Sequence, residues 1–316
     1  MTAKSEARFR KRGKLASLFR KNTSYYLMML PAMILALVFC YIPMYGILYA
    51  FQDFFPGSPT WIFDSGVEWV GLKHFEDFFS SQYFGRTLWN TVRNSLMSIG
   101  FGFWLPIVFA LLLNEIRHKY FKKTLQTISY LPHFISTVIV AGMVLGMLSY
   151  DDGIFNTILE NLGFERINFM IEPAYFPWIL LISGLWQSFG WSSIIYLAAI
   201  AGIDQNLYEA AELDGANRFQ KAWHITLPGI SNTVVILLVM NIGSIMAGDQ
   251  EKILLLYNSA IYETADIIQT FSYREGLLGG NYSFGIAVSL FVSVINFIFV
   301  FAANKTSNKL AGYGLW

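Results

Sequence analysis

The chain has 316 residues, of which 55% are hydrophobic, 17% are aromatic and only 14% are charged, and its net charge at pH 7 is +1. Soluble domains carry about 25% charged residues, so this composition excludes an ordinary soluble domain and predicts a protein that crosses a membrane several times. The near-neutral charge gives no indication of nucleic-acid binding. The single cysteine, Cys40, allows neither an internal disulfide nor a cysteine-based metal site, and no metal site is expected.

The first 25 residues form a basic tail with eight lysines and arginines between positions 4 and 21. The apolar stretch that follows is too long for a secretory signal and has no clear cleavage site. The tail is either a short amphipathic helix on the inner leaflet or a solvated topology anchor, and the sequence leaves both alternatives open.

Six segments are long and apolar enough to cross the hydrocarbon core as helices, which takes about 20 residues each. They predict an all-α membrane domain over residues 26–303, followed by a tail at 304–316. The predicted spans are Tyr26–Phe51, Trp89–Leu113, Leu125–Leu148, Pro177–Ala201, Ser231–Ala247 and Ser283–Ala303. Prolines inside three of them favour a packed bundle, because neighbouring helices must satisfy the carbonyls that proline frees.

Basic residues predict the orientation, because they accumulate on the cytoplasmic side. Sixteen lie in the N-terminal tail, the second and fourth connections and the C-terminal tail, against five in the opposite connections. Both termini are therefore expected to be cytoplasmic. The opposite connections, Gln52–Leu88, Ser149–Phe176 and Gly248–Tyr282, are long and rich in aromatic and turn residues, which suits either an interfacial aromatic belt or a docking rim for an external partner.

The connection at residues 204–230 differs from the apolar segments around it. Asp204 can cap a helix that ends near Gly215, and a second short helix is expected from Asn217 to Trp223. Pro228 then precedes the next span. A helix lying on the lipid surface would favour lysine and arginine, but this connection has four acids and two basic residues. It therefore predicts a cytoplasmic helix–turn–helix that binds a protein partner.

This connection resembles the EAA loop of binding-protein-dependent ABC importer permeases, on the stretch EAAELDGA, Phe219 and ITLPGI. ALLLNE before the second connection, YLPHFIS after it, GLWQSFGWSSIIYLAAIAGID and NYSFGIAVSLF are similar to the sugar-transport branch of that family. The resemblance covers nearly the whole chain from about Tyr26, and the branch it is most similar to transports oligosaccharides or polysaccharide fragments.

The resemblance implies a six-helix subunit with the type I importer permease (MetI-like) fold in a bacterial plasma membrane. It implies a complex with a second, homologous permease, two ABC ATPases and an extracellular solute-binding lipoprotein. The EAA loop would seat in a cleft of the ATPase, with Glu209 paired to a basic group there and Gly215 allowing close backbone approach. The residues that the resemblance assigns to coupling are Glu209, Ala210, Ala211, Asp214, Gly215, Ala216, Phe219, Leu227 and Pro228.

Nucleotide chemistry is not expected on this chain. It contains no GxxxxGK[ST] phosphate loop, so it is expected to bind no cofactor and to be no enzyme, with ATP and magnesium held by the partner ATPase.

Candidates for the solute path come from the kind of side chain that binds sugars, namely aromatic faces, amides and hydroxyls. Polar groups inside a span face a cavity or form helix–helix hydrogen bonds, and the sequence leaves that choice open. The candidates are Trp186, Gln187, Trp191, Tyr196, Asn241, Ser244 and Asn296. His133, in the third span, is expected to be a packing residue, since no second histidine or acid lies beside it.

The rival hypothesis is an ion-coupled secondary transporter for a small polar solute. Such a protein would need ionisable residues near the bilayer midplane and inverted repeats, whereas no aspartate or glutamate lies within the core of any predicted span. A membrane enzyme would need paired carboxylates or a nucleophile with its base, and neither is found. The sequence therefore favours the permease.

Overall fold

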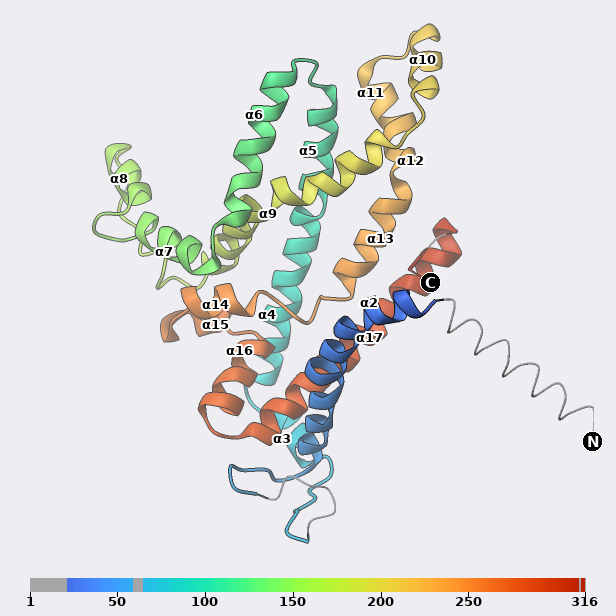
Figure 1. Cartoon of the computed structure of the whole chain (residues 1–316). Coiled ribbons are helices and arrows are strands. Elements are labelled where there is room, and N and C mark those ends of the chain that lie inside the picture. Colours follow the sequence, from blue (N-terminus) through green and yellow to red (C-terminus); the bar gives the residue numbers. More distant parts are fainter. Residues whose placement is uncertain (1–21, 59–64, 313, 316) are drawn as a thin grey trace, which may run out of the picture.

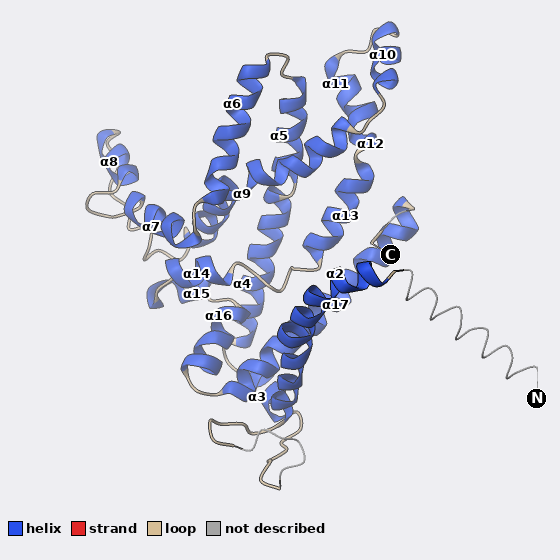
Figure 2. Ribbon diagram, in the orientation of Figure 1, coloured by secondary structure: helices blue, strands red, loops and turns tan. Residues whose placement is uncertain are grey.

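The computed structural model describes residues 22–58, 65–312 and 314–315 (Figure 1). These residues are helical almost throughout (Figure 2), and the β-pairing among them is one isolated bridge between Gln52 and Trp69. The predicted all-α fold is confirmed for this part of the chain. The prediction for the basic tail falls mostly on residues 1–21, outside the described residues.

Four uninterrupted helical segments are long and apolar enough to span a membrane: Thr23–Phe51, Phe84–Glu115, Phe176–Ala201 and Tyr282–Lys309. They coincide with the first, second, fourth and sixth predicted spans. Their elements are α2 (Thr23–Ala36), η1 (Leu37–Tyr41) and η2 (Ile42–Phe51); α4 (Phe84–Met97), η3 (Ser98–Gly102) and α5 (Trp104–Glu115); α9 (Phe176–Ala201); and α17 (Tyr282–Ala311). The last helix continues eight residues beyond the predicted Ala303, until Gly312 at φ +80° ends it.

The other two predicted spans are bent, so the prediction of six holds only if each bent pair counts as one. The third predicted span, Leu125–Leu148, was wrong as a straight helix. Helix α6 (Lys119–Tyr130) and the 3-10 turn η4 (Leu131–Phe134) meet α7 (Thr137–Met147) at 98°. The helix breaks because Ile135 and Ser136 are both extended, and Ser136 caps the next helix by accepting from Ile139 N at 3.4 Å.

The fifth predicted span is also shorter than expected. Helices α11 (Arg218–Lys221) and α12 (Leu227–Gly229), joined by the π-helical η5 (Ala222–Thr226), meet α13 (Ser231–Ile242) at 62°. Helix α13 stops five residues before the predicted Ala247. A turn follows it and ends at Gly248, whose φ of +63° favours glycine.

The helices form a bundle with two distinct ends (Figure 1). The connection between α5 and α6 and the loop of α10 (Gln205–Leu213) and α11 lie at one end, and α3 (Lys73–Ser80) lies at the other. Helix α5 packs along α9, α17 packs along η2 and α13, and α6 packs on α9. At the α6–α9 crossing, a Cβ added at Gly190 would collide with the Ser129 backbone, so glycine permits this close approach.

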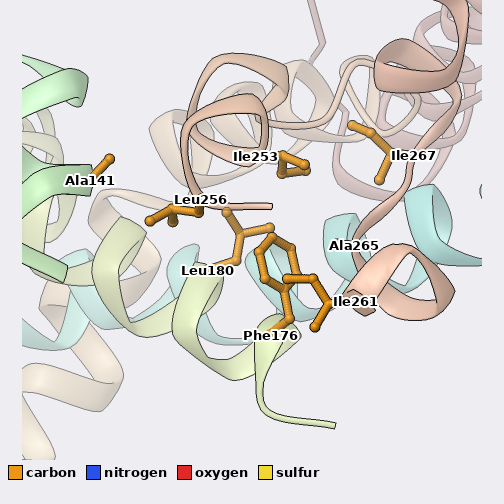
Figure 3. Close-up of a cluster of buried hydrophobic side chains, with 8 residues drawn as sticks. All are labelled: Ala141, Phe176, Leu180, Ile253, Leu256, Ile261, Ala265 and Ile267. Atoms are coloured by element: carbon orange, nitrogen blue, oxygen red, sulfur yellow. The ribbon is translucent and has the colours of Figure 1, made fainter. Parts of the chain in front are cut away.

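The connection at residues 248–282, expected to be a long loop, is largely short helices. They are α14 (Gln250–Leu256), η6 (Ser259–Ile261), α15 (Tyr262–Ala265), α16 (Ile268–Ser272) and η7 (Tyr273–Leu278). Figure 3 shows the buried cluster that holds this segment: Ile253 and Leu256 meet Leu180 and Phe176 of α9. Ala141 of α7 belongs to the same cluster, so the segment packs on both helices.

A buried ionic network fixes the same segment to α4. Asp266 is fully buried, and its two carboxylate oxygens accept from Arg274 at 3.1 and 2.8 Å. Arg86 of α4 lies 3.5 Å from Asp266, and the amide of Asn90 donates to its backbone carbonyl at 2.9 Å. The hydrogen bond to Asp266 raises the pKa of the Arg274 guanidinium above its ordinary value, so the guanidinium stays charged.

Replacing Asp266 with asparagine is expected to destabilise the protein strongly, because it removes the fully buried carboxylate that the partly buried Arg86 and Arg274 share. Removing one partner of a buried ion pair costs about 3–5 kcal/mol. Thermal unfolding of the purified protein in detergent measures this effect as a lowered Tm. The control is Asp53→Asn, which breaks a half-exposed pair with Lys73 at 3.9 Å and should change the Tm little. Equal Tm values for the two variants would contradict the role given to Asp266.

Candidate functional site: an exposed helical loop and a cavity between the helices

The first helix of the 204–230 loop begins and ends where the sequence predicts. Asp204 caps α10 by accepting from Asn206 N at 3.0 Å. Gly215 adopts φ +77°, and the amides of Gly215 and Ala216 donate back to the carbonyls of Glu212 and Ala211 at 3.1 and 2.9 Å. This pair of bonds is a Schellman cap, which requires a left-handed residue and so explains the glycine.

The second helix begins at a reciprocal cap. The Asn217 side chain accepts from Gln220 N at 3.0 Å, and the Gln220 side chain accepts from Asn217 N at 2.8 Å. The helix continues through η5 and α12, in which Pro228 lies in the first turn. The predicted helix–turn–helix is therefore present, and it is joined to α9 on one side and to α13 on the other.

Two side-chain contacts hold the helices of the loop together. Lys221 donates to Glu212 at 2.6 Å, and the hydroxyl groups of Tyr208 and Thr226 lie 2.9 Å apart. The hydrogen bond from Lys221 lowers the pKa of Glu212. Because the folded-state pKa is lowered, this link is complete at neutral pH and is lost as the pH falls through that lowered pKa. At physiological pH the two helices of the loop are therefore linked by both contacts.

Large apolar side chains of the loop stand in solvent. Leu213 is 90% exposed, Phe219 is 89% exposed and Trp223 is 70% exposed. Glu209 is also exposed, and it makes no hydrogen bond or ion pair with the described residues. An exposed apolar surface rimmed by polar residues is typical of a docking site.

The remaining residues that the resemblance assigned to coupling surround this surface. Asp214, Gly215, Ala211 and Ala216 line a concavity of about 370 Å³. Ala210 is exposed, as is Pro228, and Leu227 is half-buried against the core. The loop also touches the neighbouring connection, since Arg218 Nε lies 3.7 Å from the carboxylate of Glu115 at the end of α5. The role in coupling of the residues that the resemblance assigned stays a prediction.

A cavity of about 770 Å³ lies between α4, α9, α13, α14 and the bend after η4. This size is typical of ligand sites, which measure about 300–1,000 Å³. Gln187, Asn241 and Ser244, three of the predicted path residues, line it. Asn94 and several serines and threonines contribute further amide and hydroxyl groups, among them Thr91, Ser98, Ser136, Thr137, Ser188 and Ser192.

The other predicted path residues do not line this cavity. Trp191 stacks on His133 with ring centroids 4.6 Å apart and an interplanar angle of 5°, a packing contact. Tyr196 is buried in the cluster formed with Phe103 and Ile107. Asn296 of α17 accepts from Met246 N, in the turn after α13, at 3.0 Å, and Trp186 is 41% exposed. The prediction that these four residues line the solute path stays a prediction, and their positions outside the cavity do not support it.

At the breaks in the helices, backbone carbonyls accept hydrogen bonds from side chains at the cavity. Gln187 donates to the carbonyl of Ile135 at 3.0 Å, at the bend between η4 and α7. Ser95 donates to the carbonyl of Ile245, in the turn after α13. Irregular backbone at membrane depth is tolerated where protein or a cavity satisfies it, so both breaks belong to the construction of the cavity.

Two lining residues were missed by the sequence reasoning. Lys252 was counted only as a charge in an outer connection, yet it is 3% exposed and lines the cavity. The side-chain amide nitrogen of Asn94 is buried and has no hydrogen-bond partner. No local pattern identifies either residue, because both positions depend on the 248–282 segment folding back onto α4 and α9.

Three comparisons with known proteins match this architecture. The family model for "Binding-protein-dependent transport system inner membrane component" matches residues 102–310. Protein LplB of Bacillus subtilis is 39% identical over 94% of this chain and 92% of its own. The "Polygalacturonan/rhamnogalacturonan transport system permease protein YteP" of the same organism is 40% identical over 97% of this chain and 94% of its own.

A solved structure is similar in fold as well as in sequence. The chain matches a component of the "bacterial alginate ABC transporter in complex with alginate pentasaccharide-bound periplasmic protein" with a TM-score of 0.88 and 40% identity. The match covers 96% of this chain and all of the other.

Replacing Asn217 with alanine is expected to loosen the second helix of the loop, because it removes the reciprocal cap. Loss of an N-cap costs about 1 kcal/mol, which corresponds to roughly fivefold faster hydrogen exchange of the α11 amides if exchange follows local opening. Hydrogen–deuterium exchange with mass spectrometry measures this rate. Asn206→Ala is the matched control, since only its backbone amide is used. Unchanged exchange in Asn217→Ala would show that the cap does not order the helix.

Proposed function

The chain belongs to the family of binding-protein-dependent transport system inner membrane components, and on that premise we propose that it forms the carbohydrate path of an importer whose ATPase is a separate subunit. The sequence predicted this family and its type I permease fold. Both predictions are confirmed by the match over residues 102–310 and by the solved relative. The chain is thus a transport permease subunit. The carbohydrate, the coupling residues and the partners are proposals.

A carbohydrate solute is supported by both the relatives and the cavity. By their names, two of the three relatives belong to transport systems for polygalacturonan and rhamnogalacturonan or for alginate. Sugars present many hydroxyl groups, and the amides of Gln187 and Asn241 and the hydroxyl of Ser244 supply donors and acceptors along the cavity wall. Of the predicted path residues, these three carry the proposal best.

Coupling to the ATPase rests on one observation, namely that a helix–turn–helix exposes Leu213, Phe219 and Trp223 while its two ends are joined to α9 and α13. We propose that Phe219 and the concavity around Asp214 and Gly215 seat in a cleft of the ATPase. Glu209, which has no partner among the described residues, pairs with a basic group there. Closure of the ATPase pair then displaces α9 and α13, which are two walls of the cavity.

The complete importer contains more than this chain. We propose a second, homologous permease beside it, two ATPases that hold ATP and magnesium, and an external solute-binding protein that delivers the carbohydrate. The solved relative was captured with such a periplasmic protein. The docking place for the binding protein is the end opposite the loop of α10 and α11, where α3 lies (Figure 1).

Replacing Glu209 with lysine is expected to uncouple transport, because it places like charges where the proposal requires an ion pair. Losing one partner of a buried interfacial charge pair costs about 2–5 kcal/mol, so docking should weaken at least tenfold. ATP hydrolysis stimulated by the loaded binding protein, and uptake into proteoliposomes, measure this effect. The control is Gln205→Lys, which adds a positive charge to the same exposed helix. Full stimulated hydrolysis and uptake in Glu209→Lys would refute the role of Glu209.

The proposed orientation places the loop of α10 and α11 and both termini in the cytoplasm. The excess of basic residues supports it, with sixteen on this side against five on the other. Placing the connection between α5 and α6 at the same end as the loop agrees with that count (Figure 1). The importer would then take solute from outside, with the ATPases reached from within.

Labelling of single cysteines tests the orientation. In a Cys40→Ser background, Leu213→Cys is expected to react with a membrane-impermeant maleimide only after the cells are broken, because Leu213 is 90% exposed on the cytoplasmic loop. Leu162→Cys, which is 67% exposed in the opposite connection, should react in intact cells and serves as the control. Labelling of Leu213→Cys in intact cells would show that the loop lies outside the cell. That result would contradict the proposed orientation and the docking of the ATPase.

A further inference from the structure

The cavity contains a buried lysine whose ammonium group lacks hydrogen bonds. Lys252 of α14 is 3% exposed and lines the cavity. Its nearest charged partner is Asp249, at 3.7 Å from Nζ, which is too long for a hydrogen bond. An ammonium has three donors to satisfy, and no other described residue accepts from this one. A ligand oxygen in the cavity would therefore meet a donor that the protein leaves unused.

The ammonium lies against α9 beside the breaks that shape the cavity. A Cβ added at Gly184 would stand 3.8 Å from Lys252 Nζ, so the absence of a side chain there leaves room next to the ammonium. Gln187 and Ser188, one helical turn further on, line the same cavity. On the α4 wall, Thr91 and Asn94 line the same cavity. The lysine is thus part of a built site with polar groups on several elements.

The charges of the cavity favour an anion at this place. Its lining includes three ionisable side chains, Lys252, Asp249 and His133. The side chain of Asp249 is 49% exposed, whereas that of Lys252 is only 4% exposed, so solvent screens the acid more than the base. Because Lys252 Nζ has no hydrogen-bond acceptor among the described residues and lines the cavity, a ligand carboxylate can accept from it, and such a charge-assisted hydrogen bond is stronger than one to a neutral hydroxyl.

We propose that Lys252 is the specificity-determining residue of this cavity and that it binds a carboxylate of the solute. The solute class is then an oligosaccharide that contains uronate units, with its hydroxyl groups held by the amides and hydroxyls of the lining. This inference rests on the proposed carbohydrate function and narrows it. A neutral oligosaccharide would offer the ammonium no second anion beside Asp249 and would bind more weakly.

The test measures equilibrium binding to the assembled importer in lipid nanodiscs. The solute-binding protein is left out so that its own selectivity does not contribute. The probes are tetragalacturonate and its carboxyl-reduced, neutral counterpart. The wild type is expected to bind the acidic probe at least tenfold more tightly, and Lys252→Gln should lose that preference while binding the neutral probe as before. Lys252→Arg, which keeps the charge, is the matched control and should retain the preference.

A second variant acts in the opposite direction and does not depend on replacing a buried residue. Asp249→Asn removes the nearest competing carboxylate, while asparagine still caps α14. It is expected to tighten the binding of tetragalacturonate about threefold, because the ammonium then faces no fixed anion, and to leave binding of the neutral probe unchanged. This readout holds even if Lys252→Gln does not assemble.

The outcomes separate this inference from the proposed function. If the wild type binds both probes equally, or if Lys252→Gln keeps the acidic preference, Lys252 does not select the solute and the carbohydrate assignment stands. An unchanged affinity for tetragalacturonate in Asp249→Asn likewise counts against the site. If the wild type binds neither probe, the carbohydrate assignment falls together with the inference.

Discussion

Backbone groups at membrane depth must find hydrogen-bond partners within the protein, and the rest of this structure follows from that constraint. Continuous helices meet it along Thr23–Phe51, Phe84–Glu115, Phe176–Ala201 and Tyr282–Lys309. The chain departs from the helix at Ile135 and after Ile242, and in each place a side chain from a neighbouring helix takes up a carbonyl. Because such donors must be polar, the breaks bring amides and hydroxyls together, and the cavity lies where they meet.

The outer segment at residues 248–282 is held by two different kinds of interaction that act together. The apolar cluster around Phe176 and Ile253 attaches it to α9, and the fully buried Asp266 attaches it to α4 through Arg86. A buried ion pair on its own is weak evidence of net stability, but here it also defines position. It fixes the segment whose first helix carries Lys252 into the wall of the cavity.

The loop of α10 and α11 has the properties of a mechanical link. A Schellman cap at Gly215, the reciprocal cap at Asn217 and the hydrogen bond between Lys221 and Glu212 make it stiff. Its two ends continue into α9 and α13, which provide Gln187 and Asn241 to the cavity. In the proposed coupling, these two connections would pass a displacement of the loop to two cavity walls.

Several features of the protein were determined by the sequence alone, because they depend on local chemistry. Apolar runs predicted where four of the helices lie, and the capping residues Asp204 and Asn217 with Gly215 predicted the helix–turn–helix, since caps and left-handed turns are decided by a few neighbouring residues. The similarity of the sequence to a known family predicted the family and the fold. The orientation that the basic residues predict stays a prediction.

Only the tertiary structure decided which polar residues face the cavity. Gln187 and Trp191 are one turn apart on α9, yet the first lines the cavity and the second stacks on His133. The 98° bend at Ile135 and the folding of α14 onto α9 are contacts between distant parts of the chain, and no period or local motif encodes them. Lys252 is the clearest case: in the sequence it is one charge in an outer connection, and folding alone makes it a buried cation in the cavity wall.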